Sequence, residues 1–279
     1  MRFMIIDTHI HLVSPDREKF PLSGFTHPGA DWIENAPDLE QFLPMMKDAG
    51  VSKGILVQPH GAYGTDNSYV CSAASSESSL SPVAIIDPFD SKRIEILSEL
   101  SKKRVVGIRL FSIPTPEKSW IASTDIEPIW NSARELQMVI GVCVLPDEIR
   151  EIKKCADSYP DHIIVIDHCG FAPIHQIDDP ATEALWSLRK SPNVVLKVTT
   201  LVIDEWISAG RELQDLFPIL AEEFGISRLV WGSDFAQSKN RGYSELVELG
   251  KEAIGALGTG AKYPMGLNAK RVWSLVGPE

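Results

Sequence analysis

The stretch Ile163-Ile164-Val165-Ile166-Asp167-His168 joins four branched apolar residues to two ionisable ones. A continuous apolar run of this kind is typical of a strand that is buried on both faces, because a half-exposed strand alternates apolar and polar residues. The ionisable pair stands at the carboxyl end of the run. The same arrangement recurs along the chain and decides the fold.

Seven further runs rich in Val, Ile and Leu recur at intervals of about 25 to 35 residues. They are Phe3–Asp7, Gly54–Gln58, Val83–Asp87, Val105–Phe111, Met138–Val144, Val194–Thr199 and Leu229–Asp234. Stretches with helical periodicity lie between them, the first one marked by a candidate N-cap at Asp38 and a terminating glycine at Gly50. The others are Ser91–Ser101, Asp125–Gln137, Pro146–Ser158, Pro180–Lys190, Arg211–Phe224 and Tyr243–Leu257.

This alternation in a chain of 279 residues predicts an α/β fold, a (β/α)8 TIM barrel with a closed, parallel, eight-stranded sheet. A doubly wound open sheet is the rival fold, but it would normally carry a glycine fingerprint after its first strand, and none follows Asp7. No linker rich in Pro, Gly or Ser divides the chain. We therefore expect one domain over residues 1–279.

Composition limits the classes of function. The formal net charge is −11, and no cluster of Lys and Arg could follow a phosphate backbone, which argues against nucleic acid and anionic membranes as partners. No stretch approaches the length of a membrane span, the N-terminal apolar run is too short for a signal sequence, and the four cysteines show no CxxC spacing. We expect a cytoplasmic protein that acts on a small molecule.

Ionisable residues fall where the predicted strands end. His9 and His11 end the first strand, His168 ends the sixth and Asp234 ends the eighth. In a barrel these carboxyl ends converge on one mouth, where barrel enzymes have their active sites. His9 and His11 are two residues apart, so on a strand their side chains point the same way. The pattern predicts that these four residues form a catalytic centre.

Four further residues are predicted to contact the substrate. Arg109 is a cation in the otherwise apolar fourth strand and needs a carboxylate partner, for which a substrate carboxylate is favoured over a protein one. Lys197 raises the same question in the seventh strand, where an internal ion pair is an equal alternative. His60 and Tyr63 follow the second strand and could line the pocket.

Taken together, these motifs resemble the amidohydrolase superfamily, and within it the amidohydrolase-2 group that includes bacterial sugar-lactone and dicarboxylic-lactone hydrolases. The resemblance spans nearly the whole chain and implies a hydrolase with the fold of the metal-dependent hydrolases. The residues that carry it are Ile6-Asp7-Thr8-His9-Ile10-His11, Gly107-Ile108-Arg109, Asp167-His168-Cys169-Gly170, Trp231-Gly232-Ser233-Asp234 and Asn268-Ala269-Lys270-Arg271.

The resemblance also implies a metal site made of His9, His11 and Asp234. Metal-dependent members of the superfamily add a His from the fifth strand or a modified Lys from the fourth. This chain has no His in Val139–Val144 and has Arg109 in the fourth strand. Because the lactonase-like branch of the family tolerates this loss, one divalent metal (Zn or Mn) and metal-free catalysis are equal expectations.

We therefore predict hydrolysis of a lactone of a sugar acid or a dicarboxylic acid. Asp234 would take a proton from water while His9, His11 and His168 polarise the ring carbonyl. The substrate is expected to be anionic or polyhydroxylated, and a homodimer is compatible with the sequence. The alternatives are a lactone isomerase or metal-dependent decarboxylase that uses the same site, and a non-catalytic ligand-binding barrel. The connection 12–37 and the segment 199–206 are expected to set specificity.

Overall fold

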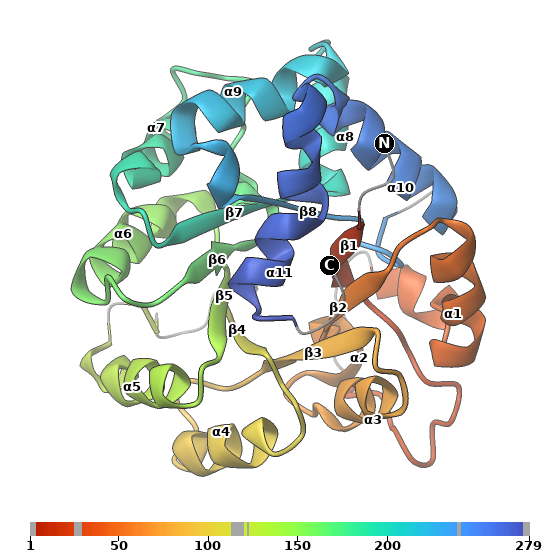
Figure 1. The fold of residues 1–279 in the computed structure, drawn as a ribbon. Coiled ribbons are helices and arrows are strands. Elements are labelled where there is room, and N and C mark those ends of the chain that lie inside the picture. The colour runs from red at the N-terminus through yellow and green to blue at the C-terminus, as the bar shows by residue number, and fades with distance from the viewer. Residues whose placement is uncertain (1–3, 25–29, 113–119, 122, 239–240, 276–279) are drawn as a thin grey trace.

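The computed structural model describes residues 4–24, 30–112, 120–121, 123–238 and 241–275. Eight parallel strands form one sheet in chain order, and helices surround it (Figure 1). The strands are β1 (Ile6–Ile10), β2 (Lys53–Val57), β3 (Leu80–Ile85), β4 (Gly107–Phe111), β5 (Val139–Cys143), β6 (Ile164–Ile166), β7 (Val194–Thr199) and β8 (Leu229–Gly232). The structure confirms the predicted (β/α)8 barrel.

The helices follow the strands in the expected alternation. They are α1 (Leu39–Asp48), α2 (His60–Tyr63), α3 (Ser68–Ser76), α4 (Arg93–Ser101), α5 (Glu127–Glu135), α6 (Ile149–Ser158), α7 (Pro180–Ser187), α8 (Thr200–Ser208), α9 (Leu216–Phe224), α10 (Tyr243–Gly255) and α11 (Asn268–Val272). The predicted start of α1 is confirmed, because the Asp38 side chain accepts from Gln41 N in a capping box. Helices α2, α3, α8 and α11 were not predicted.

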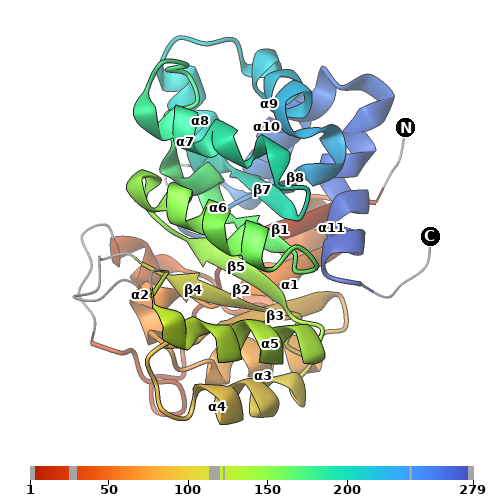
Figure 2. The same ribbon diagram turned by 90° about the vertical axis from the view of Figure 1, so that its left-hand side faces the viewer.

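The inside of the barrel is filled from one end by branched residues that alternate along the strands. Val139, Val165, Val195 and Val230 pack there against Trp273, which follows α11. Helix α11 lies across this end of the barrel, and α2 lies at the opposite end (Figure 2). These apolar residues form the floor of the barrel. The floor closes the amino end of the barrel, so a site can form only at the carboxyl ends of the strands.

Charged residues also point into the barrel, two positions further along three of the strands. Arg109 follows Gly107 by two residues, Asp167 follows Val165 by two, and Lys197 follows Val195 by two. Residues two apart on a strand share a face, so these three charges stand above the apolar floor, inside the barrel.

Strand β1 begins later than predicted. The expectation was Phe3–Asp7, of which residue 3 lies outside the described residues, and the strand spans Ile6–Ile10. Polar residues interrupt the apolar run at Asp7, but the Asp7 carboxylate accepts from His9 N and Ser233 N, so the polar stretch is satisfied inside the sheet. Strands β6 and β8 were predicted to extend to His168 and Asp234, but each ends two residues earlier.

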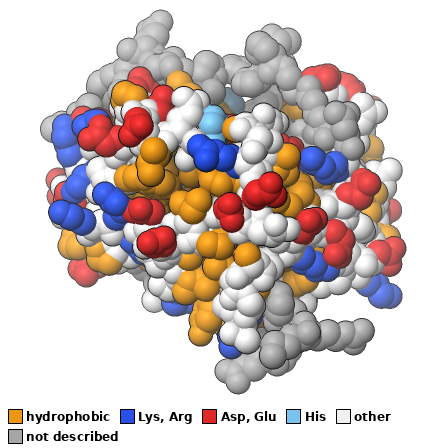
Figure 3. All heavy atoms as spheres, turned by 90° about the horizontal axis from the view of Figure 1, so that it is seen from above, with side chains coloured by type: hydrophobic (Ala, Val, Ile, Leu, Met, Phe, Trp, Pro, Cys, Tyr) orange, Lys and Arg blue, Asp and Glu red, His pale blue; other side chains and the backbone are white. Residues whose placement is uncertain are grey.

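The outer surface mixes charge with apolar side chains. On the face shown in Figure 3, acidic and basic side chains surround a central group of hydrophobic ones. Exposed large hydrophobic residues among those that the structure describes include Ile177, Leu201, Ile207 and Ile219. No helix among the described residues is long and apolar enough to cross a membrane.

Helix α10 packs so closely on β8 that Gly250 has no room for a side chain. A Cβ at this position would overlap the buried Trp231 indole, so we expect Gly250→Ala to destabilise the protein by roughly 1–3 kcal/mol. Thermal unfolding measures the effect. Gly255→Ala on the same helix is the matched control, because its Cβ would meet nothing within 4 Å and alanine favours helix. Equal midpoints for the two variants would contradict this packing.

Candidate active site

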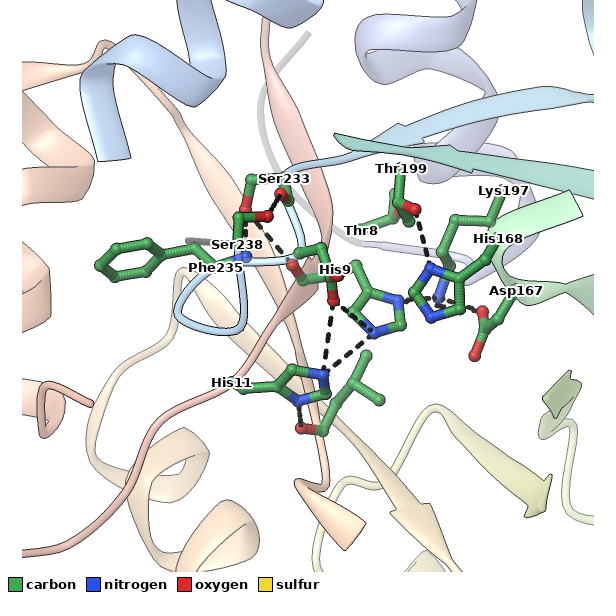
Figure 4. A network of polar contacts seen from close by, with 12 residues as sticks. Thr8, His9, His11, Asp167, His168, Lys197, Thr199, Ser233, Phe235 and Ser238 are labelled. Atoms are coloured by element: carbon green, nitrogen blue, oxygen red, sulfur yellow. Dashed lines mark hydrogen bonds and ion pairs between the residues drawn. The ribbon is translucent and has the colours of Figure 1, made fainter. Parts of the chain in front are cut away.

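Four of the predicted residues meet at one mouth of the barrel. His9 lies in β1, His11 directly after it, His168 two residues after β6 and Asp234 two residues after β8. His9 Nε2 lies 3.5 Å and His11 Nε2 3.7 Å from Asp234 Oδ1. The rings of His9 and His168 have centroids 4.9 Å apart, and Figure 4 shows the histidines facing one another. All four side chains are buried.

The position of Asp234 follows from the way β8 closes against β1. Asp234 N donates to His9 O and Ser233 N donates to Asp7 Oδ1, both over 2.9 Å. Gly232 permits this approach, because a Cβ there would lie 2.7 Å from the His9 Cβ. Asp234 has a φ of 59°, a left-handed conformation that is unfavourable outside glycine and concentrates at functional sites. This seam between β1 and β8 holds the carboxylate against the histidines.

The Asp234 carboxyl is buried, and neither oxygen has a hydrogen-bond partner among the described residues. Burial raises the pKa of Asp234 to about 8, although the nearby Arg109 charge opposes the shift. A buried polar group without a partner is unfavourable, so this carboxyl gains from any group that hydrogen-bonds to it. A carboxylate that ionises near neutral pH has the basicity needed to take a proton from water.

Two buried cations share one carboxylate beneath the histidines. Arg109 Nε donates to Asp167 Oδ2 over 2.6 Å, and Lys197 Nζ lies 2.8 Å from Asp167 Oδ1. Burial opposes ionisation, but the Lys197 and Arg109 charges hold the pKa of Asp167 well below its usual range. The partner of Arg109 is therefore a protein carboxylate, where the sequence favoured a substrate one. Lys197 makes the internal ion pair that was the equal alternative.

A cavity of about 290 Å³ opens over the site. Four predicted residues form part of its wall, together with three aromatic side chains. They are His11, His60, Arg109 and His168, with Trp32, Phe111 and Phe171. Trp32 comes from the connection 12–37, and Leu201, from the segment 199–206, also lines the cavity. Both segments that were expected to shape the pocket contribute to it.

The other predicted residues stand away from the cavity wall. His9 and Asp234 lie directly behind it, in contact with His11. Tyr63 does not line the cavity, because its hydroxyl accepts from Ser14 N over 2.8 Å and so braces the loop after β1. Lys197 is turned inward to Asp167.

Two residues of the site were not singled out from the sequence. Asp167 holds both cations, and Thr199 Oγ1 lies 2.7 Å from His168 Nδ1. Asp167 had a usable signal: two cations in apolar strands require a buried carboxylate, and Asp167 directly follows an apolar run. A threonine at the end of β7 carries no comparable signal.

The spacing of His9, His11 and Asp234 suits a metal ion. Their ligand atoms all lie within 4.8 Å of one another, and His9 Nε2 is 3.1 Å from His11 Nε2. Ligands of tetrahedral zinc with bonds of 2.0–2.1 Å are roughly 3.3 Å apart. The hydrogen bonds of His9 and His11, in contrast, are not compatible with a bound metal ion. His11 Nδ1 donates to Val57 O over 2.8 Å, so His11 Nε2 accepts, and the proton between the two rings belongs to His9 Nε2. That proton occupies the lone pair a metal would need.

Comparison with known proteins identifies relatives of this chain. The chain is 27% identical over 217 residues to the L-fucono-1,5-lactonase of Burkholderia ambifaria, an alignment that covers 74% of this chain and 71% of that protein. The family model described as Amidohydrolase (Amidohydro_2) matches residues 6–275.

Solved structures share the fold over nearly the full length. A Pseudomonas putida protein assigned as a 2-pyrone-4,6-dicarboxylic acid hydrolase superposes with a TM-score of 0.82 at 20% identity, covering 100% of both chains. An amidohydrolase from Burkholderia multivorans with bound zinc has a TM-score of 0.78 at 20% identity, covering 98% of this chain and 100% of that chain. At this identity the two structures support the fold alone. With the family model matching from residue 6 to residue 275, the chain belongs to the amidohydrolase family.

Proposed function

We propose that this protein hydrolyses a lactone, with Asp234 as the general base and no metal-dependent step. The observation that carries the proposal is the unpartnered Asp234 carboxyl beside His9 and His11, with Arg109 on the adjoining cavity wall. The similarity to an L-fucono-1,5-lactonase supports the choice of a cyclic ester as substrate.

The groups present account for each step of ester cleavage. Ionised Asp234 takes a proton from water, and the resulting hydroxide attacks the ring carbonyl carbon. The Arg109 guanidinium, which lines the cavity, faces the forming oxyanion as a donor. The ring C–O bond then breaks, and the proton held by Asp234 passes to the leaving alkoxide, which leaves a hydroxy acid. His11 and His168 are neutral, because burial lowers the pKa of each to about 3, and they form the wall against the substrate.

The cavity wall supports a narrower substrate class. Among its described residues Arg109 is the one Lys or Arg, and its Nε is already bonded to Asp167. A substrate with two carboxylates would find no second such cation there. The aromatic rings of Trp32 and Phe111 offer flat apolar surface to a ring. We therefore assign the substrate to the lactones of sugar acids, with at most one carboxylate.

A panel of sugar δ- and γ-lactones and dicarboxylic lactones, with and without EDTA, tests the proposal. We expect turnover of a sugar lactone that EDTA does not change, and ¹⁸O from solvent water in the product carboxylate. Turnover only of a dicarboxylic lactone would contradict the substrate class. Loss of turnover in EDTA with recovery on adding zinc would contradict the metal-free step, and product without ¹⁸O would indicate isomerisation or decarboxylation instead.

The pH profile reports the base directly. Because burial raises the pKa of Asp234 to about 8, most of the carboxyl is protonated at neutral pH and inactive as a base. We expect kcat/KM of the EDTA-treated protein to rise about tenfold per pH unit up to pH near 8 and then to level off. Initial rates in constant ionic strength buffers measure it. A flat profile between pH 6 and 9 would exclude Asp234 as the titrating base.

A further inference from the structure

Lys197 has a second contact that the ion pair with Asp167 does not explain. Its Nζ lies 3.3 Å from His9 Nδ1, in the buried centre of the barrel (Figure 4). An ammonium group has three donors and no acceptor, so His9 Nδ1 must supply a lone pair at this contact. A buried lysine that donates to a histidine ring decides which ring nitrogen carries the proton.

The directions of the neighbouring hydrogen bonds agree with this assignment. A backbone carbonyl only accepts, so His11 Nδ1 donates to Val57 O. His11 Nε2 then accepts the proton of His9 Nε2 over 3.1 Å. The chain runs one way, from Lys197 to His9, from His9 to His11 and from His11 to Val57. Every donor in it meets an acceptor.

The opposite arrangement leaves two donors facing each other. A proton on His9 Nδ1 would point at the Lys197 ammonium, and the nearest carboxylate oxygen, Asp167 Oδ1, is 3.9 Å away and already paired with Lys197. Protonating both nitrogens of His9 meets the same clash. The neutral Nε2–H form is the one that the surrounding groups accept.

We propose that Lys197 is a positioning residue that fixes His9 as the Nε2–H tautomer, which makes His9 a hydrogen-bond donor in the site and keeps it from serving as a metal ligand. The inference rests on the proposed function only in that the proposed hydrolysis has no metal-dependent step. The tautomer and the metal affinity can be measured whether or not a lactone is turned over, so failure of one proposal is separable from failure of the other.

The first experiment observes the tautomer in the unaltered protein. Two-bond ¹H–¹⁵N correlation spectra of histidine-labelled, metal-free protein, assigned with His9→Gln, distinguish a bare ring nitrogen from a protonated one. We expect His9 Nδ1 to be bare and Nε2 protonated. A protonated His9 Nδ1 would overturn the proposal, and this result requires no variant at Lys197.

The second experiment measures zinc affinity by competition with a chelating dye. Lys197→Met keeps the length of the side chain but removes the donor, and Arg109→Met is the matched control, because it removes an equally buried cation from the same Asp167 without touching His9. Loss of a positive charge alone raises affinity in both variants. We expect Lys197→Met to bind zinc at least about tenfold more tightly than Arg109→Met, the usual size of the effect of a side chain that orients a metal-binding histidine.

Equal zinc affinities in the two variants would show that charge, and not the contact with His9, governs the site, and would overturn the proposal. If Lys197→Met does not fold, Lys197→Leu removes the same donor in a shorter apolar side chain, and the same comparison holds. A His9 tautomer that stays unchanged in the spectra of both Lys197 variants would also contradict it, because the proton would then be fixed by His11 alone.

Discussion

Asp234→Asn is expected to lower kcat/KM for a sugar lactone by roughly 10³-fold at pH 8, because an amide cannot take a proton from water. The fold should survive the change. Burial raises the pKa of Asp234 to about 8, so the native site already tolerates a neutral group at this position near neutral pH. Steady-state rates on purified protein, with thermal unfolding of the same samples, measure both effects.

Asp234→Ala serves as the partner variant in this test. It removes the base equally but leaves a gap beside His9 and His11, so similar rates with a lower unfolding midpoint would separate catalysis from packing. Activity within tenfold of the native protein in Asp234→Asn would show that another group activates the water, and the proposed mechanism would fail.

Asp167→Ala is expected to destabilise the protein by about 3–5 kcal/mol, because it leaves the Arg109 and Lys197 charges buried without a carboxylate. The urea-unfolding midpoint measures the effect. The change should also abolish turnover, since both cations would lose the geometry they have beside His9 and the cavity.

The control for Asp167→Ala is a carboxylate in an ion pair of similar length on the surface. Asp157 Oδ2 lies 2.6 Å from Lys153 Nζ within α6, with a carboxyl side chain that is 56% exposed. We expect Asp157→Ala to change stability by less than about 1 kcal/mol. If the two variants unfold at similar urea concentrations, the buried ion pairs of Asp167 contribute no more to stability than the exposed pair of Asp157, and the prediction is wrong.

Much of the fold could be predicted because parallel strands buried on both faces are continuous apolar runs. The prediction failed where local composition misleads. Strand β1 carries Asp7 and His9 within it. Contacts with residues far along the chain, Ser233 and Asp234 after β8 and Tyr243 in α10, make those polar residues compatible with a strand. Helix α3 is rich in serine and alanine and has little apolar periodicity, while α8 follows β7 without a turn signal.

The gathering of His9, His11, His168 and Asp234 could be expected because strand ends of a barrel share one mouth. What each side chain contacts could not. Lys197 and Arg109 both needed a carboxylate, and only three-dimensional register shows that one residue, Asp167, serves both. The tautomer of His9 depends on Val57 and Lys197, whose distances no pattern in the sequence encodes.

The seam between β1 and β8 also has a consequence for the order of folding. The contact between Ser233 N and the Asp7 carboxylate joins residues that are 226 positions apart, so it closes one of the longest loops the chain can form. Contacts between residues so far apart in the sequence form late, because closing such a long loop costs entropy until the structure formed earlier has brought the two ends together. The Asp234 carboxyl reaches His9 through the same closure. A nascent chain that still lacks β8 can therefore form most of the barrel, but its active site is incomplete because Asp234 is not yet beside His9.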